Sequence, residues 1–174
     1  MLAAVALREF PQHWPGFVGD VLADGGDAAL ELGLGALAEV AEDCIDADYN
    51  GRLPAKRRAD VLKALNASAP SVVAAVFGLA DRAARGPGPA GERRLVAALR
   101  CLRHFATWVS WDGPHMAAAR AAGDPVDFAA TVAARPPAGD GAATVAALQC
   151  LRALAASPHL DLDASLGVAA AVPR

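Results

Sequence analysis

The sequence is poor in aromatic residues and cysteines and has no long uninterrupted apolar run. Aromatic residues make up 5% of the 174 residues, and the three cysteines, Cys44, Cys101 and Cys150, are widely spaced. An odd number of widely spaced cysteines matches neither a disulfide framework nor a CxxC metal pair, so we expect buried thiols in a reducing compartment. The alanine-rich runs are interrupted by Arg, Asp, Glu, Gly or Pro. We therefore expect no insertion into a membrane.

The sequence also lacks the motifs of catalytic and metal sites. Its four histidines are far apart and have no cysteine within metal-ligand spacing: His13, His104, His115 and His159. Gly86, Gly88 and Gly91 match the spacing G-x-G-x-x-G, but they follow a predicted helix. Pro87 and Pro89 between them lack the N–H groups that would bind phosphate. We therefore expect neither an enzyme nor a bound metal or cofactor.

Apolar, helix-forming sequence is abundant. Hydrophobic residues make up 55% of the chain, and alanine is the commonest of them. Because alanine is the best helix former and a poor strand former, the composition predicts an all-α protein. Pro and Gly clusters separate the expected helices, which cover residues 11–23, 27–45, 54–65 and 70–79 (two helices, or one kinked at Pro70), 92–110, 115–122, 126–134 and 142–156, with a weaker helix from 163.

Two predicted helices have nearly the same sequence. VAALRCLRHFA at residues 96–106 and VAALQCLRALA at residues 145–155 are identical at eight of eleven positions, at an offset of 49 residues. Two helices per unit and a period of about 40–47 residues are typical of HEAT and armadillo solenoids. The alternative is convergence of two Ala/Leu-rich amphipathic helices. We favour the repeat, because the match includes a shared Cys and Arg.

The repeat predicts an all-α, HEAT-type solenoid (an α-α superhelix) of about three helical hairpins. We expect it to form a single domain over residues 1–174. Neither end of the sequence has the polar character of a capping repeat, so we expect the chain to be a fragment of a longer array.

The segment LREFPQHWPGFVGDVL, residues 7–22, is the most distinctive in the chain, because two prolines bracket a His-Trp pair. It resembles a turn between two helices in the exportin-1/importin-beta-like domain of nuclear export receptors. The matching residues are Arg8, Glu9, Phe10, Pro11, Trp14 and Pro15. The Gln-His between Pro11 and Trp14 is most similar to the exportin-5 type, called Hasty in plants. Segments 37–45, 53–65 and 99–111 resemble later helices of that domain, so the resemblance covers roughly residues 7–160.

This resemblance implies a karyopherin-beta nuclear transport receptor. Such a receptor binds Ran in its GTP form together with cargo and shuttles between nucleus and cytoplasm through the nuclear pore, past its nucleoporins. For the exportin-5 type the implied cargo is structured small RNA such as microRNA precursors, with some proteins. Within the motif, we expect Pro11 and Pro15 to end one helix and start the next, and Trp14 to pack between hairpins rather than to bind a ligand.

Charge is distributed unevenly along the chain. Residues 20–48 contain nine acidic and no basic residues, whereas residues 52–103 contain eleven basic and three acidic ones. Such asymmetry can create binding patches. The candidate basic partner-binding surface consists of Lys56, Arg57, Arg58, Arg93, Arg94, Arg100 and Arg103. The alternative is that these residues are ordinary charges on solvated helix faces.

Two other functions stay open at this point. The first is an exportin or importin that carries protein cargo. The second is a HEAT scaffold outside transport that holds partners together. The scaffold alternative predicts no nucleotide-dependent binding of Ran.

Overall fold

The computed structural model describes residues 2–23, 25–45, 53–86, 88–109, 111, 116–117, 123–136 and 141–157. In this part of the chain the regular structure consists of seven helices and no strand: α1 (Leu2–Glu9), α2 (Phe17–Leu22), α3 (Gly26–Ile45), α4 (Ala55–Arg85), α5 (Pro89–Ala106), α7 (Pro125–Ala133) and α8 (Ala142–Ala155). The all-α class predicted from the composition is confirmed.

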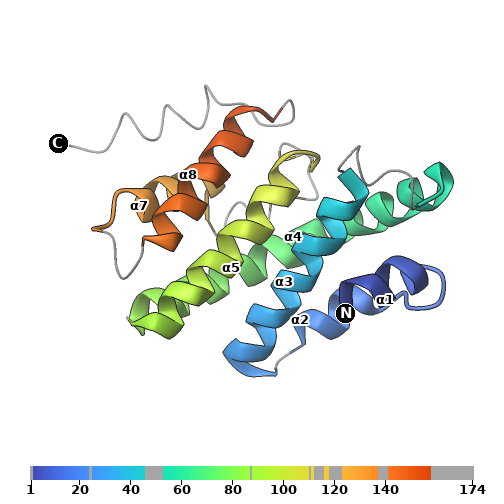
Figure 1. Ribbon diagram of the computed structural model, residues 1–174, viewed down its shortest axis with the longest axis horizontal. Helices are drawn as coiled ribbons and strands as arrows, with labels where there is room; N and C mark the ends of the chain where they lie inside the picture. Colours follow the sequence, from blue (N-terminus) through green and yellow to red (C-terminus); the bar gives the residue numbers. More distant parts are fainter. Residues whose placement is uncertain are drawn as a thin grey trace.

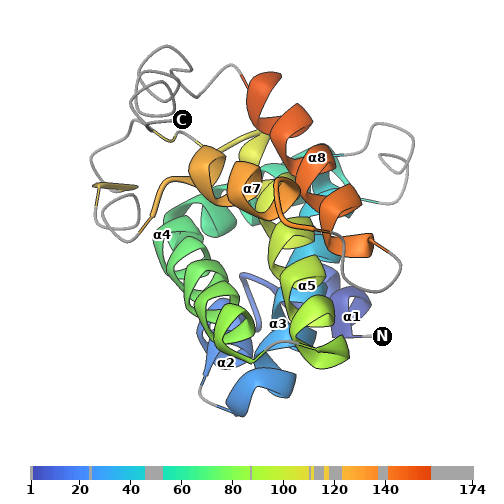
Figure 2. The same ribbon diagram turned by 90° about the vertical axis from the view of Figure 1, so that its left-hand side faces the viewer.

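The helices form two layers (Figure 1). In the inner layer α1, α3, α5 and α8 each pack against the next, and in the outer layer α2, α4 and α7 pack on α3, α5 and α8. Figure 2 shows α4 and α7 on one side of the molecule, and α1, α3 and α5 on the other. The hairpins α2–α3, α4–α5 and α7–α8 therefore stack in sequence, which is the arrangement of a HEAT-type solenoid.

The hydrophobic core lies between the two layers. In α5 and just after it, five apolar residues at helical spacing are all buried: Leu95, Leu99, Leu102, Ala106 and Val109. The packed face of α4 contributes Val61, Leu65, Val72, Val76 and Leu79, which are also buried. The loss of this apolar surface from water is the main force that holds the second hairpin together.

The first predicted helix, residues 11–23, is wrong at its start. α1 ends at Glu9, residues 10–16 form turns, and α2 begins only at Phe17. The backbone N–H groups of His13 and Trp14 both donate to the Glu9 carbonyl, at 2.7 and 3.0 Å. Pro15 has no N–H to donate and disfavours a helical conformation of the residue before it. The helix therefore starts after this proline.

The aromatic residues of this turn pack onto α2. The Phe10 ring is buried and lies 5.5 Å from the Phe17 ring, measured between centroids. The partly buried Trp14 ring lies 5.0 Å from Phe17 and meets it edge-on. The Trp14 Nε1 donates to the Asp20 carboxylate at 2.6 Å. These contacts fix the turn against the first hairpin.

Arg57 connects the start of α4 to the end of α1. Its guanidinium donates to the carbonyl oxygens of Leu7, at 3.3 Å, and Arg8, at 2.6 Å. The last carbonyls of a helix have no partner within it, and a cation is favoured beside them. A residue predicted to form a basic surface is therefore used to hold the fold.

The structure settles the two alternatives for residues 54–79. α4 is one helix of 31 residues that contains Pro70 in its interior. α5 begins at Pro89, three residues before its predicted start, with proline in the first turn where its missing N–H costs nothing.

The last predicted helices differ in how far they are described. Those at 126–134 and 142–156 are confirmed to within one residue at each end. Of the predicted helix at 115–122 the structure describes Met116 and Ala117 alone. The weaker helix from 163 lies outside the described residues.

Among the described helices, α4 has the length and composition to cross a membrane. An 18-residue window of it has a mean hydropathy of 1.4. This corrects the expectation that every apolar run in the sequence is too interrupted to span. The grounds for a span are length and composition only. In the structure one face of α4 packs against α3 and α5.

Candidate functional site

A groove of about 1420 Å³ runs across the inner layer. α3 and α5 form its two long walls, α1 contributes Leu2 and Ala3, and α8 contributes Ala142 and Gln149. The groove is therefore bordered by helices from every hairpin.

The α3 wall of the groove is acidic. Glu31, Glu39 and Glu42 line it, and their separations of eight and three residues place them on one face of the helix. Leu32, in the same groove, is 74% exposed. Sequence reasoning noted the acidic segment but assigned none of these glutamates to a site. Their helical spacing was the signal that could have identified them.

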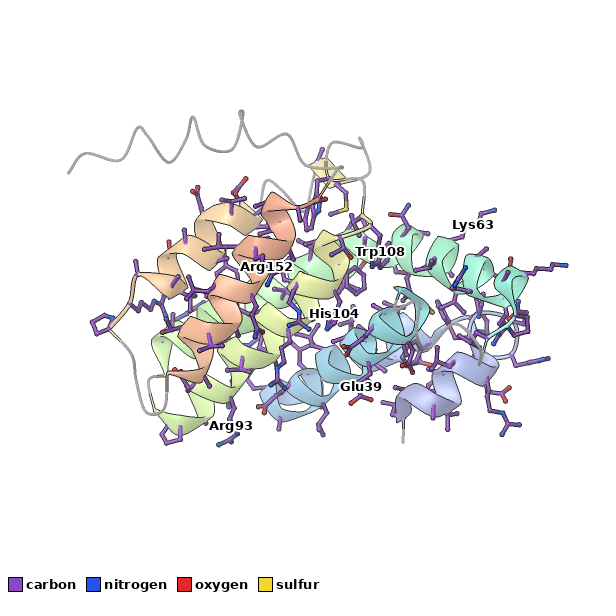
Figure 3. All side chains as sticks on the ribbon, turned by 45° about the horizontal axis from the view of Figure 1, so that its top comes forward. Glu39, Lys63, Arg93, His104, Trp108 and Arg152 are labelled. Atoms are coloured by element: carbon purple, nitrogen blue, oxygen red, sulfur yellow. The ribbon has the colours of Figure 1, made fainter. Side chains whose placement is uncertain are left out.

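The α5 wall is basic. Arg93, Arg100, Arg103 and His104 line it. Figure 3 shows Arg93 and His104 on α5, next to the helix that carries Glu39. The three arginines belong to the basic surface predicted from the sequence, and the structure brings them together along one helix. The groove thus has one wall of each sign.

Ion pairs connect the helices of the two walls: Arg93 with Glu31 at 3.7 Å and Arg94 with Asp27 at 3.0 Å. His104 Nε2 also lies 3.7 Å from a carboxylate oxygen of Glu42. Arg82 of α4 also contacts Asp27, at 2.6 Å. Arg94 does not line the groove, and it is partly buried between two helices. Arg94, which the sequence analysis placed on the basic partner-binding surface, therefore holds α5 against α3.

Arg103 joins the second hairpin to the third. Its Nη1 donates to Gln149 Oε1 of α8 at 2.9 Å, and its Nη2 lies 3.2 Å from His104 Nε2. Arg100 is exposed on the same wall. Arg100 is therefore well placed to meet a negative group on a partner.

Lys56, Arg57 and Arg58 lie away from the groove. They occupy the first turn of α4, and none of them lines it. α4 and α5 form a hairpin, so the start of α4 is roughly 40 Å along a 31-residue helix from the turn where α5 begins. The seven basic residues proposed from the sequence therefore do not form one continuous surface.

Burial lowers the pKa of His104, and the neighbouring Arg103 lowers it further, while Glu42 opposes this shift. A histidine whose pKa is lowered by folding is protonated first in the unfolded chain as the pH falls. We expect the free energy of unfolding to be highest above the usual histidine pKa of about 6.5, and to decrease as the pH falls from there toward the folded-state pKa of His104. Urea titrations between pH 7.5 and 5 would measure this slope.

The variant His104→Gln provides the control for the pH slope. Glutamine cannot take up a proton, so the His104 contribution to the slope disappears. The variant should lose less stability than the wild-type chain between pH 7 and 5. Equal losses in both chains would contradict the assignment.

The three cysteines, Cys44, Cys101 and Cys150, are buried. Burial raises the pKa of Cys44 to about 11 and that of Cys150 to about 12, and it also raises the pKa of Cys101. Thiols with raised pKa values stay protonated at neutral pH and are poor nucleophiles and metal ligands. Across the described residues, no group of three or more His, Cys, Asp or Glu side chains could hold a metal ion. The groove has acidic, basic and exposed apolar side chains, which can bind a partner through charge and apolar contact.

The comparisons with known proteins identify a family. Residues 1–113 match the family described as exportin 1-like protein. No curated protein and no solved structure gives a significant match. The match includes the turn at residues 10–16 and the hairpins α2–α3 and α4–α5. It ends before α7, although the sequence resemblance was expected to extend to about residue 160.

The matched residues make up more than half of the chain, and they carry both long walls of the groove. Domains of this kind belong to transport receptors, and the stack of helical hairpins is the fold that the sequence resemblance implied. The chain therefore belongs to the exportin 1-like family of karyopherin-type transport receptors.

Proposed function

We propose that the chain is part of a nuclear export receptor that binds Ran-GTP and cargo and shuttles between nucleus and cytoplasm past nucleoporins. Membership of the exportin 1-like family supports this proposal. We assign partner binding to the groove, because it is the place where exposed charges of both signs and an exposed leucine lie together.

The opposed charges of the groove favour a protein partner over RNA. A protein surface with acidic and basic residues can pair with both walls, and Leu32 can meet an apolar side chain of it. An RNA backbone would be attracted by α5 but repelled by the three glutamates of α3. Within this groove we therefore propose contact with a protein, either Ran-GTP or protein cargo.

Structured small RNA is a second cargo class that we propose, following the exportin-5 type. The Gln-His pair in the turn at residues 10–16 supports this subtype. The first turn of α4 offers basic side chains outside the groove, among them the exposed Lys56. Contact of RNA with that turn would leave the groove available for Ran.

The stacked hairpins would respond to binding by changing curvature. Each hairpin contacts its neighbours only, so small rotations at successive interfaces add up. Polar contacts cross these interfaces. Between α5 and α8, Arg103 donates to Gln149 and Glu92 accepts from the Ala143 N–H at 3.0 Å. We propose that residues 1–174 act as one solenoid unit in this way.

Capture of Ran by the immobilised chain tests the proposal. Ran is loaded with GTP or GDP and added with or without an RNA hairpin that has a 3′ overhang. We expect preferential capture of Ran-GTP, and stronger capture with the hairpin if RNA is cargo, because coupling between two ligands is reciprocal. If neither nucleotide form binds, the transport proposal fails and the scaffold alternative replaces it.

Charge-reversal variants then test the groove itself. Arg100→Glu should weaken Ran-GTP binding by about 10-fold, and Glu39→Arg by a similar factor, because a protein partner uses both walls. For RNA in the groove, Glu39→Arg should instead strengthen binding. Lys63→Glu is the matched control, because Lys63 is exposed on α4 away from the groove (Figure 3). An equal loss in the control would contradict the groove assignment.

A further inference from the structure

Two contacts across the groove set the register of its walls. Glu31 of α3 meets Arg93 of α5, and Glu42 of α3 meets His104 of α5, each at 3.7 Å. Arg93 and His104 lie at opposite ends of this stretch of α5 (Figure 3). The two helices lie side by side and run in the same direction (Figure 1). In both contacts the α5 residue is 62 positions later in the chain, so this offset relates facing residues along roughly 17 Å of helix.

This register sets a glycine against an alanine between the two contacts. Gly35 of α3 faces Ala97 of α5, and both line the groove. A Cβ atom added at Gly35 would meet nothing within 4 Å, so the space beside it is open. Ala38, on the same wall, is buried beneath this space. The groove is therefore hollow between its two bridged ends, and we call the part floored by Gly35, Ala38 and Ala97 the basin.

The basin has one free charge of each sign at its rim. Glu39 is exposed one turn after Gly35, and Arg100 is exposed one turn after Ala97. Neither side chain forms an ion pair or a hydrogen bond with another described residue. The charged residues at the two ends of the stretch, in contrast, already contact each other across the groove. The rim therefore presents an anion and a cation with which a partner can pair.

The shape of the basin suits a flat apolar side chain. Leu32 lies one turn before Gly35 and is 74% exposed, so it can cover one side of a bound group. Aromatic side chains bury large apolar areas, and an arginine such as Arg100 can stack on the face of a ring. Aromatic residues that fill a pocket inside a polar rim often provide much of the binding energy of a protein interface.

We propose that the basin binds one aromatic side chain of a partner protein. A lysine or arginine beside that side chain pairs with Glu39, and an aspartate or glutamate on its other side pairs with Arg100. The inference rests on the proposed binding of a protein partner in the groove, and it adds the chemistry of the segment that is bound.

The charges of the α3 wall favour a protein segment over a nucleobase. A nucleobase is also aromatic and could enter the basin. Its phosphates would then lie near Glu39 and the other two glutamates of that wall, which would repel them. A protein segment can carry the cation that Glu39 lacks.

Thiol tethering tests the basin without any transport partner. Leu32→Cys places a thiol one turn from Gly35 and keeps both rim charges, and the three native cysteines are buried. The thiol is converted to a mixed disulfide with 2-phenylethanethiol or with ethanethiol, which has the same linker without the ring. The concentration of 2-mercaptoethanol that releases half of each adduct is measured by mass spectrometry. We expect the aromatic adduct to require about 10-fold more reductant, because the ring occupies the basin.

Variants show whether the basin causes this preference. Leu148→Cys is the matched control, because Leu148 is an exposed leucine that does not line the groove. Its two adducts should differ by no more than about 2-fold. Gly35→Leu, added to Leu32→Cys, fills the basin and should abolish the preference, whereas Gly35→Ala should keep most of it. Leucine and alanine are both better helix formers than glycine, so α3 should stay folded, which circular dichroism verifies.

Equal release of the two adducts from Leu32→Cys overturns the proposal, and so does a preference that survives Gly35→Leu. The tethering result does not depend on Ran, so failure of the anchor site and failure of Ran capture can be told apart. Where Ran-GTP is captured, Gly35→Leu should weaken its binding by about 10-fold, and unchanged binding would overturn the proposal. Capture of the RNA hairpin that Gly35→Leu weakens would place a nucleobase in the basin and would also overturn it.

Discussion

Replacement of Leu99 by alanine is expected to lower the free energy of unfolding by about 2–5 kcal/mol. Leu99 is fully buried on α5, at the point where the second hairpin meets the third. The substitution removes apolar contact with the core and leaves a cavity that the surrounding helices can fill only in part. Urea unfolding followed by circular dichroism would measure the loss as a lower midpoint at unchanged m-value.

Leu148→Ala is the matched control, because Leu148 occupies the equivalent position of the repeat on α8. Its side chain is 56% exposed, so the same three carbons are removed from a largely solvated site. We expect a change of less than about 1 kcal/mol. Similar losses for the two variants would mean that Leu148 is as well covered as Leu99, which would contradict the structure of α8.

The fold could be predicted because helix packing repeats locally in the sequence. The spacing of Leu95, Leu99 and Leu102 indicates one face of a helix, and in the structure all three are buried on α5. The repeat of 49 residues identified the hairpin as the unit of architecture. The helical spacing and the repeat both arise from contacts between neighbouring helices. Such contacts leave a periodic pattern in the sequence.

Helix ends were less predictable, because they depend on competing local effects. Pro11 was a suitable first residue for a helix, yet Pro15 and the packing of Phe10 on Phe17 delay α2 to Phe17. Pro70 suggested a break, but α4 continues through it. The burial of an apolar face over 31 residues outweighs one lost hydrogen bond.

The candidate site could be predicted in part only. Clustering of arginines along the sequence identified Arg93, Arg100 and Arg103, which do line the groove. It could not show that Arg94 pairs with Asp27, because these two residues lie 67 positions apart in the sequence, on different helices. The spacing of Glu31, Glu39 and Glu42 could have placed them on one face of α3, but only the packing of α3 beside α5 shows that this face borders a groove.

Replacement of Gly33 by alanine is expected to destabilise the first hairpin by about 2–3 kcal/mol. A Cβ atom at Gly33 would lie 2.2 Å from the Val21 carbonyl oxygen and 3.3 Å from the Val21 Cβ. The obstructing oxygen belongs to the backbone of α2, so it cannot rotate away, and α2 must shift relative to α3. Chemical unfolding should show a lower midpoint, and near-ultraviolet circular dichroism should show a changed environment for Trp14, which packs on α2 through Phe17.

Gly35→Ala separates this close approach from the general effect of glycine in a helix. Gly35 lies two residues later in α3, and an added Cβ there would meet nothing within 4 Å. Because alanine is favoured over glycine within helices, Gly35→Ala should stabilise the chain by about 0.5–1 kcal/mol. Opposite signs for the two variants would show that the contact between α2 and α3, and not helix propensity, requires glycine at position 33. A neutral Gly33→Ala would instead mean that the two helices lie further apart, and that α2 does not hold α3, the acidic wall of the groove, in place.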